Sequence, residues 1–489
     1  MKRNFIRKYI SLSLSLLILL SAILSGCANS KTNTHTVSST QTNNASLEEA
    51  SSYNSLFKKD NIVNLNLNIS KDELDKMFSS DNTGVFHSAD ITIEDETISN
   101  VGICIKGNMS YRTVSRSDSN RYSFAVDFNQ YESGKSYYGL NNLVLNNNSG
   151  DASFLREYIA YEMLNSIGAP APLCTFAKLS INGEYFGLYT MVESPYNSQS
   201  FAKRVFGADE NIDTYEAGIG SSFASENSLK NISLTSGNSE NSSNLNKLYE
   251  AISNLNEENY KDIENILDVD SFLKYAASNV AFGSYDSYLS TQAQNYYLVY
   301  YNNKFYFVPW DYDKSFGGFE GDQGISCAIK IDNPIFDTTT AQLPLLKLIG
   351  YNEYKERYHS YLRELTNYLD NIENRITDLS NLIRDDVVND PTKLFTNEQF
   401  ENELVYSDSQ IDTSNISFPI ISKRNKGNQP TGNPNNISNS PKGDIPSPPS
   451  VQRPAGGDNQ SIKTGPQKSS FSLMTYAIKL RENLKSQLS

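Results

Sequence analysis

Residues Phe305–Gly318 read FYFVPWDYDKSFGG and carry the densest chemical signal in the chain. Aromatic and β-branched residues up to Pro309 predict a buried strand. Two carboxylates, Asp311 and Asp313, follow two residues apart and would share a face if the strand continued. Acidic oxygens on a rigid platform, followed by Gly-Gly, suit a hard divalent cation. The alternative is a turn in which both aspartates cap backbone groups.

A second group of polar residues lies upstream of this stretch. A helical pattern over Val269–Ala281 is followed by Asp286 in a loop, by Asn295, and by a hairpin with strands Tyr296–Tyr301 and Phe305–Val308. This order is similar to the catalytic segment of protein kinases, whose loop aspartate orients the substrate hydroxyl and whose later asparagine and aspartate hold magnesium. The standard signature is altered, because His-Arg-Asp and Asp-Phe-Gly are both missing.

Composition limits the possible classes of protein. The 489 residues are 38% hydrophobic and 11% aromatic, which is enough for a large core and excludes wholesale disorder. With 42 basic and 56 acidic residues, the net charge of −14 argues against nucleic acid as a partner. The three histidines disfavour a histidine-rich zinc site and supply a Ser-His-Asp triad poorly. Any chemistry is therefore expected to rely on carboxylates.

The N-terminus predicts export and attachment to a membrane. Residues 1–26 have the basic start and apolar stretch of a signal peptide. They lead into Leu24–Cys27, which reads LSGC and resembles a bacterial lipobox. That resemblance implies that lipid on Cys27 anchors an extracytoplasmic protein to the bacterial cell membrane. The alternative is an ordinary N-terminal membrane anchor with an incidental cysteine.

Composition also predicts the domain organisation. Residues 27–59 are expected to form a flexible tether, and 60–422 the folded domain. The Pro/Gly/Asn-rich stretch 423–470 predicts a disordered insertion, and 471–489 a final helix that docks on the domain. Within the domain, the Ser/Asn-rich residues 221–246 are expected to form a mobile surface loop.

Asp151–Gly168 gives the clearest helical pattern in the domain. Asp151 or Ser153 can cap its start and Gly168 can end it. Arg156 falls on the apolar face of this helix. Two interpretations stay open: an arginine that extends to solvent, and a buried ion pair or ligand contact.

Several motifs follow one another along the chain: Ile105–Ser110 (IKGNMS), Asp151–Tyr161 (DASFLREYIAY), Ile181–Tyr189 (INGEYFGLY) with Glu193, Tyr285-Asp286, Asn295–Leu298 (NYYL) and Pro309–Asp313 (PWDYD). In this order they resemble the CotH family of spore-coat-associated atypical protein kinases. The resemblance implies an α+β fold, kinase-like with two lobes. It also implies transfer of the ATP γ-phosphoryl group to serines of surface or spore-coat proteins.

The resemblance implies roles for the acidic residues and their neighbours. Asp286 would be the catalytic aspartate and Asp311 the principal ligand of Mg²⁺, or of Mn²⁺ in its place. Asp313 and Asn295 are further candidate metal ligands.

Three other residues are candidates for contacting nucleotide. Lys106 would touch phosphate or be solvated beside a tight turn, and Arg156 would pair with a carboxylate near the phosphates. Glu193 would lie where adenine binds, or be a surface residue. The kinase lysine that pairs with a helix glutamate has no clear counterpart. Arg121 is the nearest basic residue to the expected strand, while Glu157 and Glu162 compete for the glutamate role.

Two other functions compete with the kinase. The first is a surface or spore-coat assembly module that binds partners on a kinase-like scaffold without turnover. The second is a glycosidase with Asp286 and Asp311 as its acid/base pair.

Overall fold

A computed structural model of the chain describes residues 53–79, 83–208, 212–238, 242–319, 322, 324–407 and 471–489. The predicted signal peptide with Cys27 and the predicted insertion 423–470 lie outside these ranges. Part of the predicted tether requires correction. Residues Tyr53–Phe57 form the 3-10 helix η1, and Tyr53 and Leu56 are buried in the core of the first sheet. The folded part therefore includes Tyr53, seven residues before the predicted boundary at 60.

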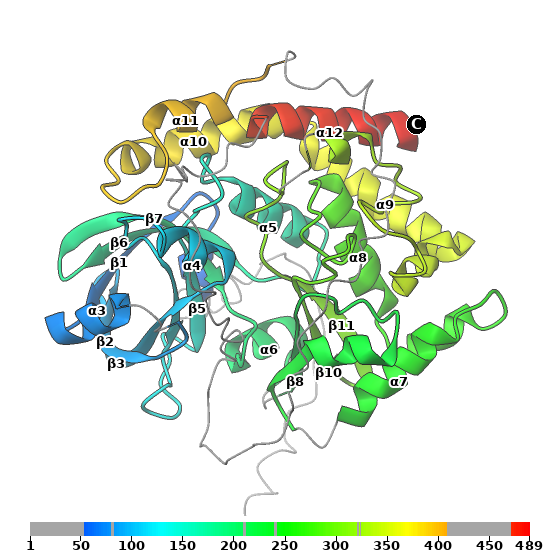
Figure 1. Ribbon diagram of the computed structural model, residues 1–489, viewed down its shortest axis with the longest axis horizontal. Helices are drawn as coiled ribbons and strands as arrows, with labels where there is room; N and C mark the ends of the chain where they lie inside the picture. Colours follow the sequence, from blue (N-terminus) through cyan, green and yellow to red (C-terminus); the bar gives the residue numbers. More distant parts are fainter. Residues whose placement is uncertain are drawn as a thin grey trace, which may run out of the picture. The chain divides into compact units, whose positions relative to one another are not determined.

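The first sheet is a closed barrel with strand order β1-β2-β3-β4-β5-β7-β6, drawn in blue and cyan in Figure 1. Neighbouring strands are antiparallel except β1 and β6, which run parallel and close the barrel. The strands are β1 (Ile62–Asn68), β2 (His87–Ile93), β3 (Glu96–Lys106), β4 (Ser123–Asp127), β5 (Asn142–Asn146), β6 (Cys174–Ile181) and β7 (Glu184–Glu193).

Local sequence accounts for strand β1 and the β6–β7 hairpin. In β1, Val63, Leu65 and Leu67 are buried in the barrel core and alternate with asparagines, as the sequence predicts. The predicted turn between β6 and β7 is also confirmed. Asn182 and Gly183 both have positive φ, 53° and 83°, which a two-residue hairpin of this kind requires.

The second sheet has the order β11-β10-β8-β9, and all of its strand pairs are antiparallel. Its strands are β8 (Asp213–Ala217), β9 (Ile232–Ser236), β10 (Tyr296–Tyr301) and β11 (Lys304–Pro309). The predicted β10–β11 hairpin is confirmed, and its turn residues Asn302 and Asn303 both have positive φ.

The prediction of a mobile surface loop over residues 221–246 is wrong where the structure describes this stretch. It contains the 3-10 helix η2 (Glu226–Asn231), strand β9 and the start of helix α7 (Ser242–Ser253). Leu229 and Ile232 are buried in the large core. The Ser/Asn-rich composition does not predict strand β9, because this strand is stabilised by pairing with β8, which the local pattern does not reveal.

The largest core lies among helices that come mostly from the second half of the chain. The remaining helices are α3 (Lys71–Phe78), α4 (Met109–Val114), α5 (Arg156–Ser166), α6 (Gln199–Phe206), α8 (Val269–Ala281), η4 (Tyr260–Asn265), η5 (Ile325–Ala328), η6 (Pro344–Gly350), α9 (Asn352–Leu369), α10 (Ile372–Val388), α11 (Asn397–Glu403) and α12 (Leu473–Leu488). The protein is thus a mixed α+β fold.

Helix α5 begins five residues later than the pattern from Asp151 suggests. The Asp151 carboxylate accepts hydrogen bonds from the backbone N–H groups of Ser153 and Arg156, which forms a tight turn before the first helical residue. Gly168, with φ of 64°, follows the helix as predicted.

The predicted final helix, α12, is confirmed at Leu473–Leu488 (red in Figure 1). It packs on α9, α10 and η5 and buries Leu473, Tyr476 and Leu480. Within the described ranges, no helix has the length and hydropathy needed to cross a membrane.

A buried ion pair joins the barrel to the helical part of the protein. Arg121, just before β4, donates to Asp390, which follows α10, at 2.7 Å. Asp390 also accepts from the N–H of Leu188 in β7 at 2.9 Å. Because both charges are almost completely buried, removing one partner leaves the other unpaired in a region of low dielectric.

We predict that Asp390→Ala lowers the free energy of unfolding by about 3–5 kcal/mol. The matched control is Asp386→Ala, since Asp386 at the same helix end pairs with the more exposed Lys178. Loss of that pair should cost about 0–1 kcal/mol. Urea denaturation of the two variants would measure the difference, and equal losses would contradict the assignment.

Candidate active site

The loop after β11 carries Asp311 and Asp313 and holds Asp311 in a strained conformation. Strand β11 ends at Pro309, so these two carboxylates come together through a loop and not through strand alternation. Asp311 has a φ of 62°, which is uncommon for a residue with a Cβ, and its N–H donates to the hydroxyl of Tyr161 on α5 at 3.3 Å. Between the aspartates, Tyr312 is buried edge-on against Tyr161 and Phe282. Packing therefore holds the strained loop, a pattern common at functional sites.

Asp286 lies in the loop after α8 and is held by two amides. The side-chain nitrogen of Gln294 donates to the Asp286 carboxylate at 2.5 Å. The side-chain nitrogen of Asn295 donates to the Asp286 backbone carbonyl at 2.8 Å. Asn295 itself has a positive φ of 60°. Asp286 and Asn295 were predicted from the sequence and Gln294 was not, although its position directly before Asn295 was the available signal.

The structure supplies a lysine–glutamate connection that the sequence analysis could not assign. Lys106, at the end of β3, donates to the side-chain oxygen of Asn146 at 2.9 Å. The amide nitrogen of Asn146 then donates to both oxygens of Glu157 on α5, at 2.9 and 2.8 Å. Lys106 also lies over the ring of Trp310, 5.6 Å from its centroid, next to Asp311. One asparagine thus bridges the lysine and the helix glutamate.

The other candidates for that pair lie elsewhere. Arg121 is bonded to Asp390, as described above. Glu162 forms salt bridges with Arg375 and Lys59. Glu157 is therefore the glutamate of α5 that meets the predicted site residues, and Lys106 is its basic partner.

Burial raises the pKa values of four carboxylates that lie in this region. Burial and the negative charge of Asp311 raise the pKa of Glu157 to about 8. Burial raises the pKa of Asp313 to about 6, against an opposing effect of Lys314. The pKa values of Asp286 and Asp311 are also raised, chiefly by burial. Two lysines lie among these mutually repelling carboxylates. A bound cation would further stabilise the charged forms of the carboxylates.

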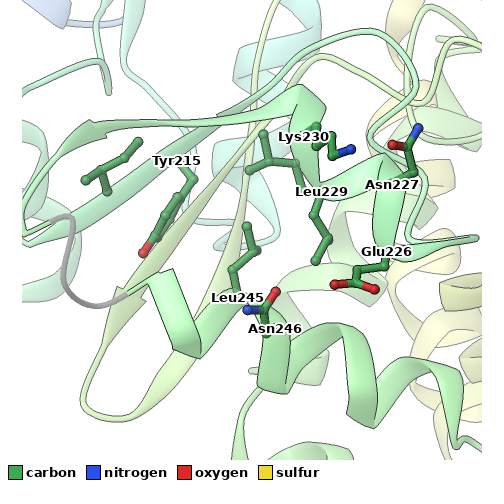
Figure 2. Close-up of a pocket in the computed structure, with 9 residues that line it drawn as sticks. Tyr215, Glu226, Asn227, Leu229, Lys230, Leu245 and Asn246 are labelled. Carbon is green, nitrogen blue, oxygen red and sulfur yellow. The ribbon is translucent and has the colours of Figure 1, made fainter. Parts of the chain in front are cut away.

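Glu216 of β8 is a fifth carboxylate in this group, and the sequence analysis missed it. Burial raises its pKa, while Lys106 acts in the opposite direction. Adjacent residues of a strand point to opposite faces of the sheet, so its neighbour Tyr215 lies on the other face. There Tyr215 lines a hollow of about 570 Å³ with Leu229 and Leu245 (Figure 2). None of the predicted site residues lines this hollow.

Asp311 and Asp313 fit a magnesium ion better than a metal caged by protein alone. Mg²⁺ is usually held by one or two carboxylates together with phosphate oxygens and water. Among the described residues, no group of three His, Cys, Asp or Glu side chains is arranged to hold a metal ion. The two aspartates, with the side-chain oxygen of Asn295 as a further donor, are the candidates that the chain offers.

Arg156 and Glu193 are engaged in ion pairs inside the protein. Arg156 donates to Asp151 at 2.5 Å and to Glu403 at 2.8 Å, so the buried ion pair is correct and the solvent-extended arginine is wrong. Glu193 is buried and pairs with Arg204, so its interpretation as a surface residue is also wrong. The predicted contacts of both side chains with nucleotide gain no support from this geometry.

The CotH kinase protein family profile matches residues 103–413, which is more than half of the chain and contains every carboxylate of the site. The chain belongs to the CotH kinase protein family. It is 25% identical over 313 residues to the inner spore coat protein H of Bacillus subtilis (strain 168), covering 60% of this chain and 82% of that protein. It is also 37% identical over 73 residues to the inner spore coat protein H-like protein of the same strain, covering 15% of this chain and 23% of that protein.

For this CotH family member, Glu157 should make stability depend on pH. Because its folded pKa of about 8 exceeds the ordinary value of 4.5, the native state binds more protons than the unfolded state between these values. The free energy of unfolding should therefore fall as pH rises through that window. We predict that Glu157→Gln removes this loss, so its stability gain over the native chain grows by on the order of 2–4 kcal/mol from pH 4.5 to 8.

The measurement is urea denaturation at several pH values, with EDTA present to remove metal ions. Glu162→Gln is the matched control on the same helix, because it loses salt bridges with Arg375 and Lys59 and should not gain stability. A gain for Glu157→Gln that did not change with pH would contradict the prediction.

Proposed function

We propose that this protein is a secreted, lipid-anchored protein serine kinase of the CotH family. It would transfer the γ-phosphoryl group of ATP to serines of a surface or spore-coat protein, with Mg²⁺ or Mn²⁺. The observation that carries this proposal is the Lys106–Asn146–Glu157 connection beside Asp286 and Asp311. A kinase needs a positioned lysine, a metal-binding aspartate and an aspartate for the acceptor hydroxyl at one site.

The proposed fold is kinase-like and has two lobes. The barrel would take the place of the small lobe, with Lys106 at the end of β3. Asp286 and Asp311 come from loops next to α8 and β11, in the part that would form the large lobe. Helix α5 would carry Glu157 between the two parts.

Phosphoryl transfer depends mainly on positioning and on charge neutralisation. Asp286, held by Gln294, would accept a hydrogen bond from the serine hydroxyl and orient it toward the γ-phosphorus. Lys106, fixed by Asn146, would bind phosphate oxygens. Asp311 and Asp313, with Asn295, would hold Mg²⁺, which neutralises the charge of the phosphates when bound.

The location of the protein is part of the same proposal. Cys27 would carry lipid and hold the protein at the outer face of the bacterial membrane. The name of the Bacillus subtilis relative places that protein in the inner spore coat, which supports a coat or surface protein as the substrate here. A surface assembly protein without turnover is the function that remains if no transfer occurs.

We predict that the protein binds ATP only when a divalent cation is present. Asp311 and Asp313 would otherwise repel the triphosphate. Thermal shift with ATP, measured with Mg²⁺, with Mn²⁺ and with EDTA, tests this dependence. Equal stabilisation by ATP in EDTA would remove the metal-binding role of both aspartates.

We also predict that Asp286→Ala and Asp311→Ala each abolish phosphoryl transfer, with different effects on binding. Asp311→Ala should weaken Mg²⁺-dependent nucleotide binding, because it removes a metal ligand. Asp286→Ala should leave that binding largely intact while transfer falls by about 10²–10⁴-fold. The exposed Asp75→Ala, on α3, is the control that should change neither quantity.

The measurement is transfer of ³²P from ATP to a serine-rich coat protein or to the chain itself, together with nucleotide titration. Transfer that persists in both variants would place the chemistry elsewhere. Nucleotide binding by the native protein without transfer to any tested acceptor would instead support the non-catalytic surface protein.

A further inference from the structure

The C-terminal helix α12 contacts the segment that follows the candidate metal ligands. We call residues 311–319 and 324–331 the Asp311 segment. Tyr476 of α12 is fully buried, and its hydroxyl accepts a hydrogen bond from the N–H of Gly324 at 2.7 Å. Its ring lies so close to Gly317 that a Cβ at that position would overlap it. One side chain of α12 thus contacts the Asp311 segment at two separate points.

The last turns of α12 bind the far end of the same segment. The side-chain amides of Asn483 and Gln487 both donate to the carbonyl oxygen of Ile329, each at 3.0 Å. The side-chain oxygen of Gln487 accepts from the N–H of Ile331, also at 3.0 Å. Apart from the short helix η5, the Asp311 segment has no regular secondary structure in its described residues, so these side chains satisfy backbone groups that lack helix or sheet partners.

The first turn of α12 connects to the other half of the site through one buried arginine. Glu403 of α11 accepts from the N–H of Leu473 at 2.7 Å and from the guanidinium of Arg156 at 2.8 Å. Arg156 is the residue directly before Glu157 on α5. Its backbone carbonyl accepts from the hydroxyl of Ser315, in the Asp311 segment, at 3.3 Å. A continuous chain of contacts therefore leads from Leu473 of α12 through Glu403 and Arg156 to Glu157.

From these contacts we infer that α12 is a positioning element of the active site, with Tyr476, Asn483, Gln487 and Glu403 as positioning residues. This inference rests on the proposed kinase function. When α12 is docked, its side chains hold the Asp311 segment. Its first turn also holds the start of α5, through Glu403 and Arg156. Asp311 and Glu157 thereby keep the relative placement that nucleotide binding and transfer need. Tyr476, Asn483 and Gln487 act through the Asp311 segment, and Glu403 of α11 acts through Arg156.

The alternative is that α12 acts only as a large apolar plug, which would stabilise the core without any influence on the site. The chain offers a control on the same helix. Arg481 donates to Glu373 of α10 at 2.6 and 2.8 Å and to the carbonyl oxygen of Leu369 at 3.3 Å, and both of these partners lie outside the Asp311 segment. Arg481→Ala should weaken docking of α12 on α10, whereas Tyr476→Phe and the double variant Asn483→Ala/Gln487→Ala release the Asp311 segment.

The test uses the full chain and compares these three variants. Hydrogen exchange should become faster in the Asp311 segment of Tyr476→Phe and of the double variant, but not of Arg481→Ala. The kcat for transfer should fall roughly tenfold in the first two variants, since small displacements of reacting groups carry large rate penalties. In Arg481→Ala, kcat should stay within about twofold even where the melting temperature falls.

A reciprocal effect separates positioning from general stability. If α12 favours the nucleotide-bound arrangement, then a non-hydrolysable ATP analogue with Mg²⁺ must slow amide exchange in α12, remote from the nucleotide. The native chain and Arg481→Ala should show this protection, and Tyr476→Phe should lose it.

Three outcomes would overturn the inference: unchanged exchange in Tyr476→Phe, unchanged kcat in both segment variants, or an equal loss of kcat in Arg481→Ala. Failure of the proposed function is distinguishable from these outcomes. A native chain that transfers nothing would refute the kinase, while exchange in the Asp311 segment would still show whether α12 holds it.

Discussion

The buried guanidinium of Arg156 is the constraint on which the arrangement of the candidate active site depends. A charge with 1% exposure is strongly destabilising unless carboxylates pair with it. Here the two carboxylates come from Asp151, in the turn before α5, and from Glu403, which lies 247 residues after Arg156 in the chain. Pairing therefore brings the α5 start, α11 and the first turn of α12 together. Glu157, one residue after Arg156, is placed by the same interaction.

The site itself stores energy in two forms. Burial of several carboxylates near each other raises their pKa values and disfavours their charged forms. Asn295 and Asp311 also hold left-handed backbone conformations that are costly for residues other than glycine. Both costs persist only because the surrounding packing is rigid, with Tyr312 and Tyr161 in contact at the centre. A bound cation with phosphate would relieve the first cost, which is consistent with a site built for a metal–nucleotide complex.

The family profile and the geometry point to the same candidate site, but the geometry identifies more of its residues. The family profile covers the barrel from β3 onward and most of the helical part. The structure adds residues that no short motif contains, namely Asn146, Gln294 and Glu216. Asn146 and Gln294 orient residues that the motifs identify, and the charge of Glu216 interacts with that of Lys106. Their identities should therefore matter for activity even though they lie outside the recognisable segments.

Sequence alone determined the local elements and the order of the acidic residues. Turn chemistry and periodicity depend on near neighbours, so they predict the hairpins at Asn182-Gly183 and Asn302-Asn303 and the helix at Leu473–Leu488. The order Asp286, Asn295, Asp311 is likewise read directly from the sequence. Only the tertiary structure decided that Asn146 joins Lys106 to Glu157 and that Arg156 is buried with Glu403. It also decided that residues 232–236 form a strand, because β8 supplies the pairing. Partners in these side-chain contacts are between 11 and 247 residues apart, and burial, not local spacing, selects them.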